Sequence, residues 1–330
     1  MDTLFSHVTV LTMDARMSLW TDAFVGVTDG KISWLAKKAP EEQPQRIIDG
    51  SGMVLMPGLV NAHTHLPRSI LRGYADDVAL ESWLNDYIFP REGKLDARCV
   101  KAVTLLGIAE SLRFGVTSIS EMYFCSEAQA EAFAESGMKV NLSRSATMYL
   151  GEDFDFERDP ACQELVALHE KWHGYDHGRI QVEAGIDAVY TSTYQLWDAL
   201  AEYAINNKLG LQLHLSETKQ EQDECEEQYG LTPAQLFDCH HVLDTRVTAA
   251  HCVHLTQEDM RLLAKRHVSV AHCPVSELKL ASGCADVMGM VKAGMNVCLG
   301  TDSAASNNNL DLFEEMKACA LMAKGRTGDP

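Results

Sequence analysis

The sequence predicts an α/β fold in which a small β domain precedes a (β/α)8 barrel. From Pro57 onward, short β-favouring runs alternate with segments that carry helix signals. Neither a Gly-x-Gly-x-x-Gly nor a Walker-type loop follows the first run, so an open nucleotide-binding sheet lacks its main support. Eight units favour the closed barrel, with strands expected at residues 58–63, 116–120, 139–143, 180–186, 211–215, 247–250, 268–271 and 297–300.

Capping residues between these runs support the alternation. A Ser or Thr three residues before a Glu or Gln predicts helix starts at Ser126, Thr218 and Thr232. Glycines predict the helix ends, at Gly115, Gly137, Gly210 and Gly294.

Residues 1–56 are expected to form the N-terminal part of the small β domain, and residues 57–330 the barrel. The runs 8–11 and 23–27 favour strands, and Asp29-Gly30 is a hairpin turn signal before the run 31–35.

Charge and cysteine content narrow the partners and the compartment. The formal net charge of -19 disfavours nucleic acid and anionic membrane surfaces, which both attract Lys and Arg. The ten cysteines are scattered without a Cys-x-x-Cys pair, and no signal segment or membrane-spanning run is present. We therefore expect a reduced, cytoplasmic protein.

Catalytic groups of a barrel lie at the carboxyl ends of its strands, and these ends carry imidazoles and a carboxylate. The first strand ends in His63-Thr64-His65, whose period of two points both histidines into the interior. The fifth, sixth and eighth strands end near His214, His251 and Asp302.

Each of these residues has an ordinary structural explanation when taken alone. A lone His is more often a core or surface residue, and an Asp after Gly-Thr is ordinarily a turn residue. The combination is what indicates a site, because distant strands converge only if the barrel closes. Three nitrogens, from His63, His65 and His214, with one oxygen from Asp302, suit one divalent ion such as zinc and leave room for a water.

The strand-end motifs together resemble the amidohydrolase superfamily. The likeness is greatest to its branch of S-adenosylhomocysteine, 5'-methylthioadenosine and 5'-deoxyadenosine deaminases, and it covers nearly the whole chain. The tracts that carry it are 57–65, 83–92, 214–217, 249–254 and 300–308.

The resemblance implies a metal-dependent hydrolytic deaminase of an adenine nucleoside, on a TIM barrel with a small β-sandwich domain. In it, Glu217 shuttles protons, His251 supports the reacting water and Asp302 is both ligand and proton acceptor. Zinc is the expected metal and iron the alternative. For Glu217, a helix-terminal charge beside Thr218 is the structural alternative. The resemblance places Trp83, Glu92 and Arg144 at the substrate; Trp83 could instead be core, and Arg144 could pair with a nearby acid.

Two positions depart from the family pattern. Asp187 stands at the end of the fourth strand, where the family usually has a histidine, and Glu277 stands where the pattern prefers asparagine. A carboxylate at Asp187 can accept hydroxyl hydrogen bonds but repels a substrate carboxylate. We therefore expect substrates without an amino-acid tail.

The family also continues beyond Pro330, with strands that complete the small β domain. We therefore expect an incomplete sandwich with unpaired edges and reduced stability. A homo-oligomer is compatible with the sequence. Two alternatives stay open: another ring hydrolase, acting on a guanine, cytosine, pterin or triazine, and a truncated non-catalytic homologue that binds metal or ligand.

Overall fold

The computed structural model describes residues 1–149, 151 and 153–329. The chain divides into two compact units, Met1–Gly58 and Leu59–Pro330. This division falls two residues after the boundary expected from the sequence, and each unit has its own sheet.

The first unit is built on a five-stranded sheet. Its strands are β1 (Thr3–Leu11), β2 (Leu19–Thr28), β3 (Lys31–Ala36), β4 (Arg46–Asp49) and β5 (Val54–Leu55). They are ordered β3-β2-β1-β4, and β5 pairs with β1. Asp29 and Gly30 have φ angles of 50° and 70°, so the predicted hairpin turn joins β2 to β3.

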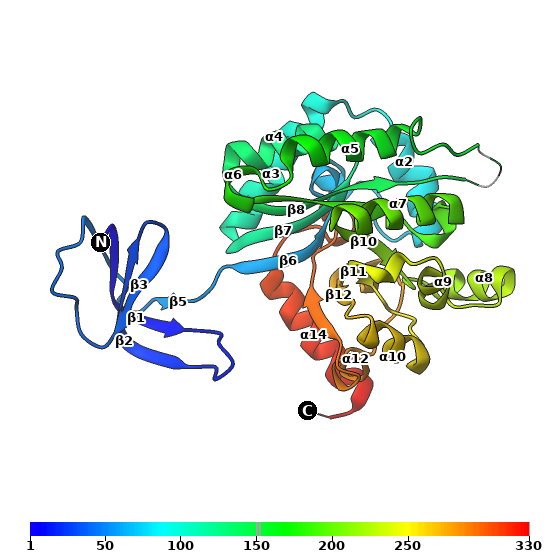
Figure 1. The fold of residues 1–330 in the computed structure, drawn as a ribbon. Coiled ribbons are helices and arrows are strands. Elements are labelled where there is room, and N and C mark those ends of the chain that lie inside the picture. Colours follow the sequence, from blue (N-terminus) through cyan, green and yellow to red (C-terminus); the bar gives the residue numbers. More distant parts are fainter. Residues whose placement is uncertain (150, 152, 330) are drawn as a thin grey trace. The chain divides into compact units, whose positions relative to one another are not determined.

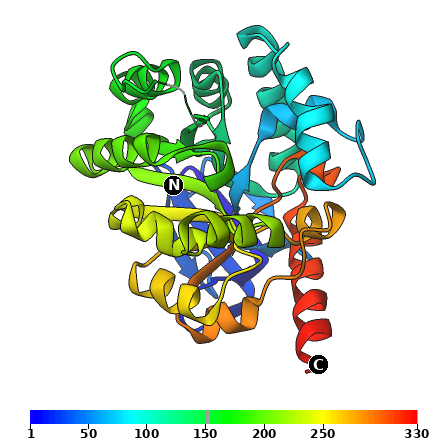
Figure 2. The ribbon, with the colours of Figure 1, turned by 90° about the vertical axis from the view of Figure 1, so that its right-hand side faces the viewer.

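The second unit is an eight-stranded parallel sheet that curves into a barrel, with helices around the strands (Figures 1 and 2). The predicted fold class is confirmed. Its strands run in sequence order around the sheet: β6 (Leu59–Thr64), β7 (Val116–Tyr123), β8 (Lys139–Ala146), β9 (Ile180–Ile186), β10 (Gly210–Leu215), β11 (Arg246–His251), β12 (Ser269–His272) and β13 (Asn296–Leu299).

The outer helices bury apolar side chains against the outward face of the strands. Leu142 on β8, Val182 on β9 and Leu213 on β10 belong to this core.

No helix in the described part of the chain is long and apolar enough to cross a membrane. The helices are η1 (Leu66–Leu71), α1 (Leu80–Ser82), η2 (Trp83–Ile88), α2 (Phe89–Glu92), α3 (Ala97–Arg113), α4 (Ser126–Ser136), α5 (Pro160–Trp172), α6 (Tyr175–Gly178), η3 (Val189–Thr191), α7 (Tyr194–Asn207), α8 (Lys219–Tyr229), α9 (Pro233–Cys239), η4 (Val242–Asp244), α10 (Gln257–Lys265), α11 (Pro274–Lys279), α12 (Val287–Lys292), α13 (Ala304–Asn307) and α14 (Leu312–Thr327).

The first and last strands of the barrel meet along a seam that includes two of the predicted metal ligands, His63 and Asp302. The backbone N–H of Asp302 donates to the carbonyl of His63 at 3.0 Å, and the Asn61 amide donates to the Thr301 hydroxyl at 2.8 Å. Gly300 permits this approach, because a Cβ there would lie 2.9 Å from the backbone nitrogen of His63.

The helix boundaries bear out some of the capping predictions and correct others. The capping box at Thr232 is present in full. Ser126 does not cap α4, because Cys125 occupies the N-cap position in a left-handed conformation (φ 53°). Gly210 does not end α7; Lys208 does so with φ 57°, and Gly210 is the first residue of β10.

Candidate metal centre

Three histidines at the ends of β6 and β10 bring their ring nitrogens together inside the barrel. One nitrogen from each of His63, His65 and His214 lies within 4.8 Å of the other two. His65 Nε2 and His214 Nε2 are 3.2 Å apart. The period of two therefore placed His63 and His65 correctly, because both are buried in the interior.

The fourth predicted ligand, Asp302, faces the same point. Its Oδ1 lies 3.9 Å from His63 Nε2 and 3.6 Å from His65 Nε2. Its Oδ2 accepts hydrogen bonds at 2.6 Å from the hydroxyls of Ser276 and Ser306. The two serines thus orient the carboxylate so that Oδ1 is directed towards the histidines.

The donor set fits a divalent metal. The Nδ1 atoms of His65 and His214 contact the carbonyls of Met122 and Asp187, which leaves both Nε2 lone pairs for the centre. His63 Nε2 is buried with no hydrogen-bond partner. Burial lowers the pKa of His63 and of His65 well below the usual range, so both imidazoles are neutral, as metal binding requires. Converging unprotonated nitrogens repel one another unless a cation lies between them.

Glu217 and His251 lie beside this centre. Glu217 Oε2 is 3.8 Å from His251 Nε2, and Glu217 Oε1 accepts a hydrogen bond from Ser282 at 3.2 Å. Glu277 Oε1 lies 3.7 Å from the other ring nitrogen of His251. Burial disfavours the imidazolium, but the carboxylates of Glu217 and Glu277 raise the pKa of His251 to about 10. The buried imidazole thus joins two carboxylates.

The contacts at the start of α8 also bear on the alternative that Glu217 is only a helix-terminal charge. The carboxylate that serves the start of α8 is Glu221, whose oxygens accept the backbone N–H groups of Ser216 and Glu217 at 3.0 and 2.7 Å. Ser216 has a φ of 48°, so Glu221 holds a strained turn. The Glu217 side chain is thereby left to face His251 instead of capping the helix.

A small inner chamber of about 30 Å³ lies over these groups. Its volume is enough for a water but not for a whole nucleoside. Trp83 lines the chamber, is 1% exposed with an unpartnered indole N–H, and also packs in a hydrophobic cluster with Leu84 and Ile88. The lining residues are His65, Arg68, Leu80, Trp83, Leu84, Phe89, Asp187, Tyr190, His214, Glu217, His251, Leu280 and Asp302.

Two further predicted substrate residues lie behind the chamber wall or away from it. Glu92 is buried and accepts hydrogen bonds from Arg68 at 2.7 Å and from the Tyr123 hydroxyl at 2.6 Å, while Arg68 itself lines the chamber. Arg144 pairs with Glu164 of α5 and does not line the chamber. The fourth predicted residue, Asp187, lines the chamber and accepts hydrogen bonds from Ser145 and Thr191.

The sequence alone did not single out the residues that support this site. Ser276 and Ser306 were missed, although Ser276 directly precedes Glu277 and Ser306 lies in the tract 300–308. Arg68 and Tyr190 were also missed, and both line the chamber. Arg68 could have been found from its place three residues after His65, which puts it in the first turn beyond the first barrel strand.

Comparisons with known proteins point to the same family as the strand-end motifs. The model of the amidohydrolase family matches residues 54–330. A 5-methylthioadenosine/S-adenosylhomocysteine deaminase of Moorella thermoacetica is 43% identical over 87% of this chain and 66% of its own length. A 5'-deoxyadenosine deaminase of Methanococcoides burtonii is 38% identical over 100% of this chain and 75% of its own.

A crystal structure of an adenosine deaminase from Xanthomonas campestris with bound zinc superposes with a TM-score of 0.92. It is 33% identical, and the match covers 99% of this chain and 75% of that one. The chain thus spans about two thirds to three quarters of the length of these proteins. The resemblance to nucleoside deaminases and the class of hydrolases acting on carbon–nitrogen bonds are confirmed.

Proposed function

This chain belongs to the amidohydrolase family, and we propose that it is a metal-dependent deaminase of adenine nucleosides that releases ammonia and gives the inosine analogue. The observation that carries this proposal is the position of Glu217 and His251. They lie beside three converging imidazoles and one carboxylate that fit a divalent ion.

Zinc is the metal we propose, held by His63, His65, His214 and Asp302. Three nitrogens and one oxygen are a donor set that zinc accepts with an open position, and the Xanthomonas campestris relative is described with bound zinc. A divalent ion there would lower the pKa of a water to about 7 and polarise it for attack.

The protein side chains would carry the protons. Asp302 Oδ1 faces His63 and His65 and accepts one hydrogen bond, from the backbone N–H of Ser303 at 2.6 Å, so its other lone pair can take the proton of the attacking water. Glu217 would protonate the ring nitrogen next to the carbon that bears the amine, so that the ring accepts electrons without full negative charge. His251 would hold the water, and proton transfer to the amine would expel ammonia.

We propose 5'-methylthioadenosine, 5'-deoxyadenosine or adenosine as substrate, in preference to S-adenosylhomocysteine. Asp187 supports this choice because its carboxylate, together with those of Glu217 and Asp302 at the chamber, disfavours a substrate carboxylate. A cytoplasmic location is also proposed, and the ten free cysteines support it.

Ammonia release tests the function directly. The purified, zinc-loaded chain would be assayed with these four nucleosides and with free guanine, cytosine, a pterin and an aminotriazine. We expect the adenine nucleosides to be turned over and the free bases to be inert. Turnover of a free base alone would identify another ring hydrolase, and metal binding without any turnover would identify a non-catalytic homologue.

A further inference from the structure

An outer cavity of about 450 Å³ opens above the inner chamber. It shares five lining residues with the chamber, Leu80, Leu84, Phe89, Tyr190 and Leu280, so the two spaces adjoin. The chamber's 30 Å³ cannot hold a whole nucleoside, so any substrate whose base reaches Glu217 must extend towards the outer cavity. If the base lies innermost, the 5' substituent is the part that lies there.

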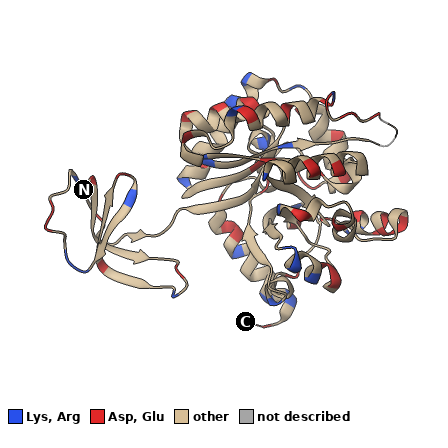
Figure 3. Ribbon diagram, viewed as in Figure 1, with Lys and Arg blue, Asp and Glu red and all other residues tan. Residues whose placement is uncertain are grey.

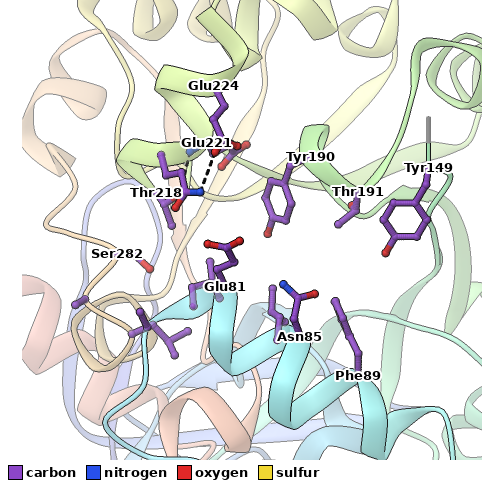
Figure 4. A pocket seen from close by; sticks show the side chains of 16 residues that line it. Glu81, Asn85, Phe89, Tyr149, Tyr190, Thr191, Thr218, Glu221, Glu224 and Ser282 are labelled. Carbon is purple, nitrogen blue, oxygen red and sulfur yellow. Dashed lines mark hydrogen bonds between the residues drawn. The ribbon is translucent and has the colours of Figure 1, made fainter. Parts of the chain in front are cut away.

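The polar wall of this cavity is acidic. Glu81 comes from α1, and Glu221 and Glu224 come from α8; Figure 4 shows these carboxylates around the same space as Tyr190 and Tyr149. No Lys, Arg or His is among the described residues that line it. The surface around α8 is acidic as well, since this helix has five carboxylates and one lysine (Figure 3).

The carboxylates of Glu81 and Glu224 are not neutralised by salt bridges among the described residues. Glu224 accepts a hydrogen bond from the neutral amide of Gln220 at 2.8 Å. The lysine of α8, Lys219, pairs with Asp223 instead. Glu221 is committed to the backbone of Ser216 and Glu217. Glu81 and Glu224 are therefore the two carboxylates that can respond to a charge on the ligand.

We propose that this cavity selects adenine nucleosides by the charge of the 5' substituent and favours a cationic tail, such as an alkylammonium group, over an anionic one. The inference rests on the proposed deaminase function and refines its substrate class. Carboxylates and aromatic rings both attract a cation, and Phe89, Tyr149 and Tyr190 supply the rings. An anionic tail would meet these carboxylates and neutral polar groups, but no cationic side chain among the described lining residues.

A matched set of three nucleosides tests the proposal. Their 5' thioethers end in a propyl, an aminopropyl or a carboxyethyl group, so they differ in charge at nearly constant size. At low salt we expect kcat/KM to fall in the order cationic, neutral, anionic. Because both carboxylates are exposed, we expect a difference of about tenfold between the two charged tails, decreasing as salt is added.

The double variant Glu81→Gln/Glu224→Gln should reduce the cationic-to-anionic ratio by at least threefold. The control is Glu202→Gln/Glu227→Gln, which removes the same charge from exposed positions of α7 and α8 that do not line the cavity, and it should leave the ratio unchanged. Equal kcat/KM for the two charged tails, or the same ratio in both double variants, would overturn the proposal.

Calorimetric binding of the same three nucleosides separates this proposal from the deaminase function. If none is turned over, the proposed function fails, yet the order of the three dissociation constants still decides whether the cavity selects by charge. If the propyl compound is turned over but the charged tails bind equally, the selectivity alone is wrong.

Discussion

Substitution of both serines that orient Asp302 should weaken metal binding without removing a ligand. Ser276 and Ser306 each donate to the buried Oδ2 at 2.6 Å. A hydrogen bond to a charged group contributes about 1.5–3 kcal/mol. Loss of both hydrogen bonds should therefore weaken the positioning of the Asp302 carboxylate by at least about 3 kcal/mol. If this free energy is lost from metal binding, zinc affinity falls roughly a hundredfold.

The assay is zinc competition between the protein and a chromophoric chelator for Ser276→Ala/Ser306→Ala. Ser111→Ala is the matched control, because Ser111 on α3 is buried with an unpartnered hydroxyl. The control should bind zinc as the parent does. If the double variant keeps its zinc affinity within threefold of the parent, the orientation argument is wrong.

Three other changes test the site and the fold. Glu217→Gln should lower kcat by about 10²–10⁴-fold with the metal retained, measured by ammonia release and metal analysis; unchanged turnover would refute the proton shuttle. Gly300→Ala should lower the free energy of unfolding by about 1–3 kcal/mol in urea melts, because its Cβ would meet the His63 backbone at 2.9 Å, and a parent-like melt would contradict this close packing. Burial raises the pKa of Glu315 to about 7 from 4.5, so the folded state binds this proton more tightly than the unfolded state does. The free energy of unfolding should therefore decrease as the pH is raised from about 4.5 to 7. Glu315→Gln should make that part of the pH–stability curve less steep, with the remaining slope due to other buried carboxyls such as Glu121 and Glu221, and an unchanged slope would show that Glu315 does not contribute.

The convergence of the proposed metal ligands was predictable because two local rules determine where these side chains lie. A strand period of two puts His63 and His65 on one face, and parallel strands direct their carboxyl ends to one mouth. The serines beside Asp302 were not predictable in the same way. Ser276 reaches Asp302 from a separate helix, and nothing in its own neighbourhood distinguishes it from a surface serine.

The outward position of Arg144 could have been predicted from the alternation of apolar and polar residues along β8, but the family resemblance was given more weight. Val140, Leu142 and Ala146 alternate with Asn141 and Ser143 along the same strand. The apolar set packs in the core beneath the helices, and Arg144 shares its face, where it meets Glu164. The alternation alone predicts this outward direction, whereas position-by-position resemblance predicts a substrate contact.

The seam between the first and last barrel strands would couple closure of the barrel to binding of the proposed metal ion. Asp302 and His63 are joined through their backbones, and in the proposed site both side chains would bind the same ion. By thermodynamic reciprocity, whatever favours the closed seam favours metal retention, and the metal stabilises the closed seam to the same extent. Zinc affinity can therefore serve as a measure of how firmly the barrel is closed, even for substitutions far from the four ligands.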